Sequence, residues 1–216
     1  MNKLKDLYRC HEWIIVIVLI PIWLFMLYVS SNPHSSVAPK QLQVRLIEVK
    51  GATPVSKPQL ILHLNGTIDS GASTRVYKTL MSTERKIDRV VITSRGGYVS
   101  EGVTIAKLLY ELHVPVMANK YCMSACTFIL SVGTDRELWR HTKVGFHSPH
   151  IKLWGLHIDR EVGSPSYVAI YNVFKLRMSP EMAKRWIDLT FAIPGKDIFL
   201  IDYKQANEFN LKLKVR

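Results

Sequence analysis

Residues 89–132 read RVVITSRGGYVSEGVTIAKLLYELHVPVMANKYCMSACTFILSV, and this stretch decides the fold. An apolar run over residues 89–93 ends in a turn with two glycines, and apolar residues then recur at helical spacing over 103–112. A second apolar run, 114–118, leads into an apolar helix predicted for 124–132. Short, continuously apolar strands that alternate with helices are typical of parallel sheets covered by helices.

The same alternation continues on both sides of this stretch. The pattern predicts further strands at residues 43–49, 60–64 and 144–147, and further helices at 73–83 and across most of 166–189. The sequence therefore predicts an α/β domain with mainly parallel strand pairing.

Length and composition fit one globular domain with a short appendage. The chain has 216 residues, of which 48% are apolar, and its formal net charge is +12. A basic chain favours anionic surroundings, and we expect a membrane surface with its lipid head groups. No zinc-finger spacing, aromatic RNA-binding signature or basic block accompanies the charge, so we expect no nucleic-acid partner.

The N-terminal segment predicts a membrane anchor. Residues 13–29 read WIIVIVLIPIWLFMLYV without a charge, enough for roughly 25 Å of helix. Lys3, Lys5 and Arg9 precede this run, which predicts a cytoplasmic arm (residues 1–12) and an exported C-terminal part. A signal peptide cleaved near residues 29–31 is the alternative, but the apolar run is longer than a usual signal core.

The rest of the chain divides into a linker and a folded domain. Residues 30–58 begin with a stretch rich in serine and proline, which predicts an extended linker. The folded domain is predicted to span residues 59–216.

Three features of the sequence carry chemistry. Gly96 and Gly97 allow a tight turn that exposes backbone N–H groups to a ligand. Ser124 precedes an apolar helix, where it is either an N-cap or a nucleophile whose oxyanion is met by the Ala125 N–H and the helix dipole. His147 ends a predicted strand 23 residues later, where it can act as a base.

The cysteines predict no disulfide framework. Cys10 lies beside the apolar N-terminal run, whereas Cys122 and Cys126 flank Ser124. We interpret the latter two as small buried core residues, because a disulfide within one helical turn is geometrically awkward.

Residues 90–149 resemble the core of the proteolytic subunits of Clp protease. In that family a strand ends in Ser-x-Gly-Gly, a serine opens the next helix, and a histidine ends a strand about two dozen residues later. This chain has Ser94 with Gly96 and Gly97, then Ser124, then His147. The likeness covers about residues 60–215. The Ser-Ala-Cys signature and the N-terminal anchor are similar to a group of bacterial periplasmic proteins with a Clp-like fold.

The resemblance implies a catalytic triad. Ser124 would be the nucleophile, His147 the base, and Asp197, which lies 50 residues after His147 and shortly before Phe199, the third member. Asp188 and Asp202 lie close in sequence, and Asp197 could instead cap a helix that begins near residue 203.

The resemblance also implies the fold, the remaining site residues and the setting of the protein. It implies a Clp/crotonase-like fold of repeated ββα units, preceded by the transmembrane helix. The protein would be a serine peptidase in a bacterial inner membrane, single-pass, with its domain on the periplasmic side and no cofactor. The resemblance implies an oxyanion hole formed by Gly97 and Ala125. It also implies that Gly96 and Met123 bind the substrate.

The partners implied are a peptide or protein substrate and further copies of the chain. Crotonase-like domains commonly pack into rings, so we expect a homo-oligomer. Arg95 replaces the usual proline of the turn, and Asn210 stands where glycine is common, so Clp-type barrel assembly and an ATPase partner are not expected. Residues 150–165 predict an arm or hairpin over the active site, with Trp154 and Leu156 contacting substrate or subunit, or else a surface loop with its aromatic side chain tucked inward.

Three alternatives remain open from the sequence. A catalytically inactive Clp-like domain could bind peptides or a membrane partner as a scaffold. A Ser–Lys dyad would use a buried lysine, with candidates Lys107, Lys120 and Lys143. A zinc site would draw on four histidines whose spacing matches no common zinc pattern, so no metal is expected: His141, His147, His150 and His157.

Overall fold

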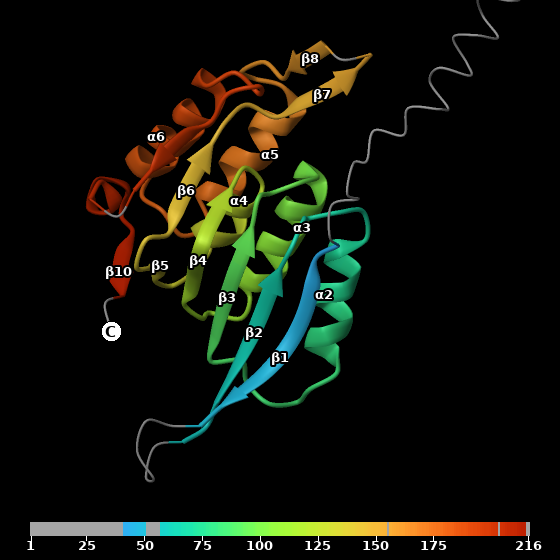
Figure 1. The fold of residues 1–216 in the computed structure, drawn as a ribbon, viewed down its shortest axis with the longest axis vertical. Helices are drawn as coiled ribbons and strands as arrows, with labels where there is room; N and C mark the ends of the chain where they lie inside the picture. Colours follow the sequence, from blue (N-terminus) through green and yellow to red (C-terminus); the bar gives the residue numbers. More distant parts are fainter. Residues whose placement is uncertain (1–40, 51–56, 155, 203, 215–216) are drawn as a thin grey trace, which may run out of the picture. The chain divides into compact units, whose positions relative to one another are not determined.

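The computed structural model describes residues 41–50, 57–154, 156–202 and 204–214 (Figure 1). The predicted cytoplasmic arm, the predicted membrane segment and residues 30–40 of the linker lie outside these ranges. Within the ranges described, no helix combines the length and apolar character needed to cross a membrane.

The main element is a mixed sheet of eight strands. Strand β1 pairs antiparallel with β2, and β2, β3, β4, β5 and β10 pair in parallel in that order. This confirms the predicted α/β class and its mainly parallel pairing. The strands along this path are β1 (Gln43–Val49), β2 (Gln59–Asn65), β3 (Arg89–Ser94), β4 (Val116–Met123), β5 (Arg136–Trp139) and β10 (Lys212–Lys214).

Strand β4 changes partners along its length. Residues 116–118 pair with β3 and β5, whereas residues 121–123 pair in parallel with β6 (Lys143–Phe146), and Cys122 also pairs with Ser94 at the end of β3. Lys120 separates the two halves with a φ of 62°. Strand β6 pairs antiparallel with β9 (Phe199–Ile201). The second half of β4 therefore brings the residue after Met123 next to the end of β6.

Helices cover the sheet, and Figure 1 shows α2 beside β1, and α5 beside α6. The sequence predicted helix across most of 166–189, but the structure has two helices there. Ser164 and Ser179 each accept a hydrogen bond from a backbone N–H three residues later, and a proline follows each serine, as is favoured at a helix start. The helices are α2 (Ala72–Met81), α3 (Val99–Tyr110), α4 (Cys126–Ser131), α5 (Pro165–Phe174), α6 (Pro180–Ala192) and the 3-10 helix η1 (Ala206–Phe209).

An aromatic cluster fixes the end of β6. Phe146 is buried and meets Trp186 of α6 edge to face, with ring centroids 5.1 Å apart, and Trp186 meets Phe174 of α5 in the same way at 5.5 Å. Such pairs contribute about 0.5–1.5 kcal/mol beyond the area they bury. The cluster holds the strand residue that directly precedes His147.

Strand β5 was not predicted, because its first two residues are charged. Both are buried: Glu137 pairs with Arg89 of β3, which crosses the intervening β4. Arg136 donates only to backbone carbonyls, and these come from several segments of the chain: Ser131, Gly133, Arg177 and Asn210. A buried charge is tolerated when hydrogen bonds satisfy it, so polar residues form a core strand here.

The folded unit also begins earlier than residue 59. Strand β1 lies within the predicted linker and pairs with β2 along its whole length, from Gln43 opposite Asn65 to Val49 opposite Gln59. Leu42 is 1% exposed and belongs to the core. The predicted hairpin is present as β7 (His150–Leu153) and β8 (Leu156–Asp159).

Candidate active site

The sheet topology gathers the residues that carry chemistry at one edge. Strands β3, β4 and β6 are parallel neighbours, and their carboxyl ends lead to Gly96 and Gly97, to Ser124 and to His147. In open α/β sheets, ligands bind outside the carboxyl ends of strands. A cavity of about 760 Å³ lies there, with walls from Gly97, the start of α3, Ser124, His147, β7, Arg160 and the start of α5.

Ser124 is not a helix cap. Its φ is 53°, which is uncommon for a residue other than glycine, and α4 begins two residues later with no side-chain cap. The Ser124 N–H donates to the Gly145 carbonyl at 2.8 Å, and the Ser124 carbonyl accepts from the N–H and Oγ1 of Thr127. Ser124 lines the cavity, and its hydroxyl makes no hydrogen bond to another described residue. Residues held in sparsely populated backbone regions cluster at functional sites.

A disulfide joins Cys122 to Cys126, which corrects the expectation of two free core thiols. The expectation assumed that both residues would lie in one helical turn. Instead, Cys122 belongs to β4 and Cys126 is the first residue of α4, and their Cα atoms lie 5.2 Å apart. That separation suits a disulfide. Both residues are fully buried, as the sequence predicted.

The two glycines pack directly against neighbouring backbone. A Cβ on Gly96, whose φ is 91°, would lie 2.6 Å from the Met123 carbonyl oxygen and 2.7 Å from Cβ of Ser124. A Cβ on Gly97 would lie 2.1 Å from the Ile68 carbonyl oxygen. Only glycine fits at either position, so the turn is held against Ser124.

Two backbone N–H groups lie beside the serine: that of Gly97, which is exposed and lines the cavity, and that of Ala125, which is fully buried. The Ile68 N–H donates to the Gly96 carbonyl, and the Ile68 carbonyl accepts from Tyr98. Within the described part of the chain, the N–H groups of Gly97 and Ala125 donate to no other group. Backbone donors at such positions can stabilise a developing oxyanion.

His147 has the tautomer that a general base needs. Its Nδ1 lies 2.9 Å from the Ser148 carbonyl oxygen, which can only accept, so Nδ1 carries the proton. This leaves the lone pair on Nε2. Burial lowers the pKa of His147, although the hydrogen bond to Ser148 raises it, and nearby His150 lowers it while Asp159 raises it. A half-buried, neutral imidazole results, with Nε2 able to accept a proton.

Ser148 and Asp159 support this histidine. The Ser148 N–H donates to the Ile193 carbonyl at 2.7 Å, and its Oγ donates to the Arg160 carbonyl at 3.2 Å. Asp159 accepts from the Gly195 N–H at 2.8 Å. Sequence reasoning missed Asp159, because the aspartate becomes a neighbour of His147 only when the β7–β8 hairpin folds back.

Asp197 is exposed, and its N–H donates to the Pro194 carbonyl. Its charge is not among the causes of the His147 pKa shift, so its assignment to a triad stays a prediction. Asp188 bonds Lys184, and Asp202 accepts from the two backbone N–H groups that precede η1. It is thus Asp202, and not Asp197, that caps the turn near residue 203.

The remaining predicted residues lie around the site. No hydrogen bond joins Ser124 to His147 in the described structure, though both line the cavity. Catalytic hydrogen bonds are often long in unliganded enzymes. Gly96 lies behind Ser124, and the Met123 side chain packs toward Gly145. Neither is part of the cavity wall.

The alternative chemistries find less support in the geometry. The three candidate lysines are exposed, and none lines the cavity with Ser124. Among the histidines considered for zinc, His147 and His150 lie together, with ring centroids 5.4 Å apart, and His141 is exposed. Among the residues described, no group of three or more metal-binding side chains occurs.

The hairpin contributes to the cavity and exposes apolar side chains. His150 and Ile151 line the cavity, and Arg160 follows the hairpin. Trp154 is 95% exposed and Leu156 is 68% exposed, so the aromatic side chain is not tucked inward. A cluster of exposed apolar residues is typical of a contact surface.

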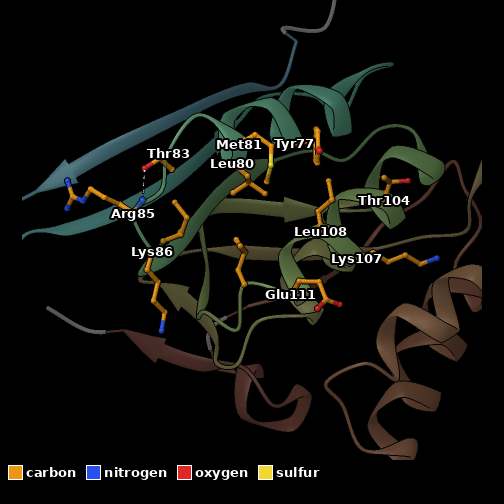
Figure 2. A pocket seen from close by; sticks show the side chains of 12 residues that line it. Tyr77, Leu80, Met81, Thr83, Arg85, Lys86, Thr104, Lys107, Leu108 and Glu111 are labelled. Carbon is orange, nitrogen blue, oxygen red and sulfur yellow. Dashed lines mark hydrogen bonds between the residues drawn. The ribbon is translucent and has the colours of Figure 1, made fainter.

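A second cavity, of about 690 Å³, lies between α2 and α3 (Figure 2). Leu80 and Met81 of α2 face the side of α3 that carries Leu108, and Lys107 lies at the margin. Its walls contain no serine, cysteine or histidine. The cavity at the sheet edge, which Ser124 and His147 line, is therefore the candidate site.

Comparison with known proteins identifies the fold. No family model and no curated protein sequence matches the chain. Among the solved structures, 470 chains match. Two of them are variants of the 1510-N membrane-bound stomatin-specific protease, one of which is in complex with a substrate peptide. Each matches 70% of this chain with a TM-score of 0.53 and 14% sequence identity. The match covers 77% of the protease chain without a named peptide and 73% of the one in complex with the peptide.

At this identity the comparison establishes the fold alone. The chain has a mixed α/β architecture that it shares with a protease, in agreement with the Clp-like fold implied by the sequence.

Proposed function

We propose that this protein is a membrane-anchored serine hydrolase that cleaves exported or membrane-associated peptides. One observation carries the proposal: Ser124, His147 and Gly97 line one cavity, where His147 is held with its Nε2 free. It is supported by the unusual backbone of Ser124 and by the N–H groups of Gly97 and Ala125, which donate to no other described group.

The proposed reaction uses these groups in order. Ser124 Oγ attacks the peptide carbonyl carbon while His147 Nε2 takes its proton. The N–H groups of Gly97 and Ala125 stabilise the oxyanion, and His147 then returns the proton to the leaving amine. Water then attacks the carbonyl carbon of the acyl-enzyme while His147 Nε2 takes a proton from it, and His147 gives that proton to Ser124 Oγ as the carbon–Oγ bond breaks.

A carboxylate would stabilise the imidazolium that forms. The resemblance to Clp subunits implies Asp197, whereas the structure brings Asp159 into electrostatic reach of His147. The Ser148 carbonyl already fixes the tautomer, so the carboxylate would mainly act through its charge.

A peptide substrate at a membrane is supported by two independent observations. The described fold is shared with a membrane-bound protease that was captured with a substrate peptide. Residues 13–29 have the composition of a membrane span, and basic residues precede it. We therefore propose a single-pass anchor in the bacterial inner membrane with the domain on the periplasmic side. We also propose a homo-oligomer that uses the exposed hairpin.

A non-catalytic scaffold is the second candidate, and the missing hydrogen bond between Ser124 and His147 favours it. The two candidates differ in the reactivity of one hydroxyl. A fluorophosphonate labels an activated serine but not an ordinary one.

The test is labelling of the purified full-length protein, with the adduct located by mass spectrometry. Wild type is expected to label at Ser124, and Ser124→Ala and His147→Ala are expected not to label. Ser166→Ala is the matched control, because Ser166 lines the same cavity and should be dispensable. Absence of labelling in folded wild type, or labelling that persists in Ser124→Ala, would overturn the hydrolase proposal.

A further inference from the structure

We infer that the Cys122–Cys126 disulfide is a positioning element of the active site, so that the protein is catalytically competent only in its oxidised form. The inference rests on the proposed hydrolase function and deepens it, because it assigns a redox requirement to the same site.

The disulfide closes a short ring around the nucleophile. Cys122 is the next-to-last residue of β4, Cys126 is the first residue of α4, and Met123, Ser124 and Ala125 lie between them. This ring therefore contains both the proposed nucleophile and one proposed oxyanion donor. A bond between its ends restricts the backbone of both.

The Cys122 end of the ring is anchored where the other site residues lie. Cys122 is paired with Ser94 at the end of β3 and with Val144 in β6. Ser94 in turn accepts a hydrogen bond from the Gly96 N–H through its Oγ. The disulfide thus ties α4 to β4. Strand β4 in turn pairs with β3, which leads to the glycine turn, and with β6, which leads to His147.

Few other interactions hold the turn. The Ser124 N–H donates to Gly145, and Thr127 donates to the Ser124 carbonyl, but the Ala125 N–H has no partner among the described residues. Ser124 keeps a φ of 53° within this ring. Such a conformation persists only where the surrounding structure over-determines it. The disulfide is the covalent part of that restraint.

Reduction of the Cys122–Cys126 disulfide would release this restraint on Ser124. Two electrons and two protons from a dithiol convert the disulfide into two thiols, and the dithiol becomes a disulfide. Cys122 and Cys126 are both fully buried, so a dithiol reaches them before folding or during opening of the chain. The bond forms in oxidising compartments and is kept open in a reducing cytoplasm. Copies of the chain that remain in a reducing compartment would therefore be inactive.

The experiment compares fluorophosphonate labelling of the full-length protein in three forms. These are the oxidised wild type, the wild type purified and kept in dithiol, and the double variant Cys122→Ala with Cys126→Ala. Counting thiols with a maleimide in denaturant, after removal of the dithiol, verifies each wild-type form, because one of the three cysteines reacts in the oxidised chain and all three react in the reduced chain. Circular dichroism and thermal unfolding establish that each form is folded at the assay temperature.

A positioning role predicts a loss in the rate of the chemical step. The maximal labelling rate should fall roughly 10- to 100-fold in the reduced and double-variant forms, as expected for a displaced nucleophile. The probe concentration at half-maximal rate should change little, and re-oxidation should restore the wild-type rate.

The possible failures are distinguishable. Labelling rates within about two-fold of each other, with only the melting temperature lowered, would show that the disulfide serves stability alone and would overturn the inference. Unfolding of both disulfide-free forms would overturn it in the same way, because the bond would then be needed for the fold. Absence of labelling in the oxidised wild type would instead overturn the hydrolase proposal, and this inference with it.

Discussion

Replacing Gly96 by alanine should disable the proposed nucleophile although the serine itself is retained. The added Cβ would lie 2.6 Å from the Met123 carbonyl oxygen, 2.7 Å from Ser124 Cβ and 3.0 Å from the Ala125 nitrogen. All three atoms belong to the turn that carries Ser124. Ordinary contact begins near 3.4 Å, so the Met123 carbonyl oxygen has to move by about 0.8 Å and Ser124 Cβ by about 0.7 Å.

The size of the effect follows from that displacement. A misplacement of about 1 Å at a reacting group costs roughly 10²-fold in rate. We therefore expect the maximal fluorophosphonate labelling rate to fall about 30- to 100-fold, which corresponds to about 2–3 kcal/mol in the activation free energy. Alanine at a φ of 91° also costs about 1–2 kcal/mol of stability.

Gly163→Ala separates these two contributions. Gly163 has a φ of 85°, close to that of Gly96, but a Cβ there would meet nothing within 4 Å. This variant should lose a similar amount of stability to backbone strain and keep the wild-type labelling rate. Both variants are assayed below their melting temperatures. Wild-type labelling in a folded Gly96→Ala variant would refute the assignment of Ser124 as nucleophile in this turn.

Four further predictions concern the charges and the hairpin around the site. The labelling rate should rise with pH as His147 loses its proton, and because burial lowers the pKa of His147, the midpoint of this rise should lie below the ordinary histidine value of about 6.5. The unfolded chain binds this proton more readily than the folded chain, so the free energy of unfolding should fall as the pH drops below about 6.5. Thermal unfolding should show a smaller fall in His147→Gln. Asp159→Asn should lower the labelling rate more than Asp197→Asn, since the Asp159 charge acts on His147, and the reverse order would support the triad implied by the resemblance. Arg160 is the only side chain with a permanent charge on the described cavity wall, so peptide esters with acidic residues should have a higher kcat/KM than esters with basic residues. Arg160→Glu should change the ratio of these two kcat/KM values roughly 3- to 10-fold in favour of the basic esters. Trp154→Ser should shift the full-length protein toward smaller species in analytical ultracentrifugation, and an unchanged distribution would exclude the hairpin tip as a subunit contact.

The sequence predicted the elements whose residues are apolar and periodic. Strands β1, β2, β3 and β6 and helices α2, α3 and α4 were placed with errors of a few residues, because their burial follows a simple repeat. Strand β5 was missed because Arg136 and Glu137 are polar, and the bonds that allow their burial come from distant segments. Strands β9 and β10 have three residues each and carry little pattern of their own.

The candidate site was predictable in part for a similar reason. Gly97, Ser124 and His147 each end a strand, and parallel neighbours bring such ends together. The disulfide was not predictable, because it depends on a transition from strand to helix between residues 122 and 126. Asp159 was not predictable because a hairpin, and not a strand end, returns it to His147.

The change of partners at Lys120 divides β4 into two parts with different tasks. Before Lys120 the strand lies between β3 and β5, where buried apolar residues and the Arg89–Glu137 pair form the core. After Lys120 it pairs with β6, keeps one pairing with β3 through Cys122 and Ser94, and leads to the proposed nucleophile. One strand thus carries both the packing that holds the sheet together and the backbone that presents Ser124 to the cavity that His147 also lines.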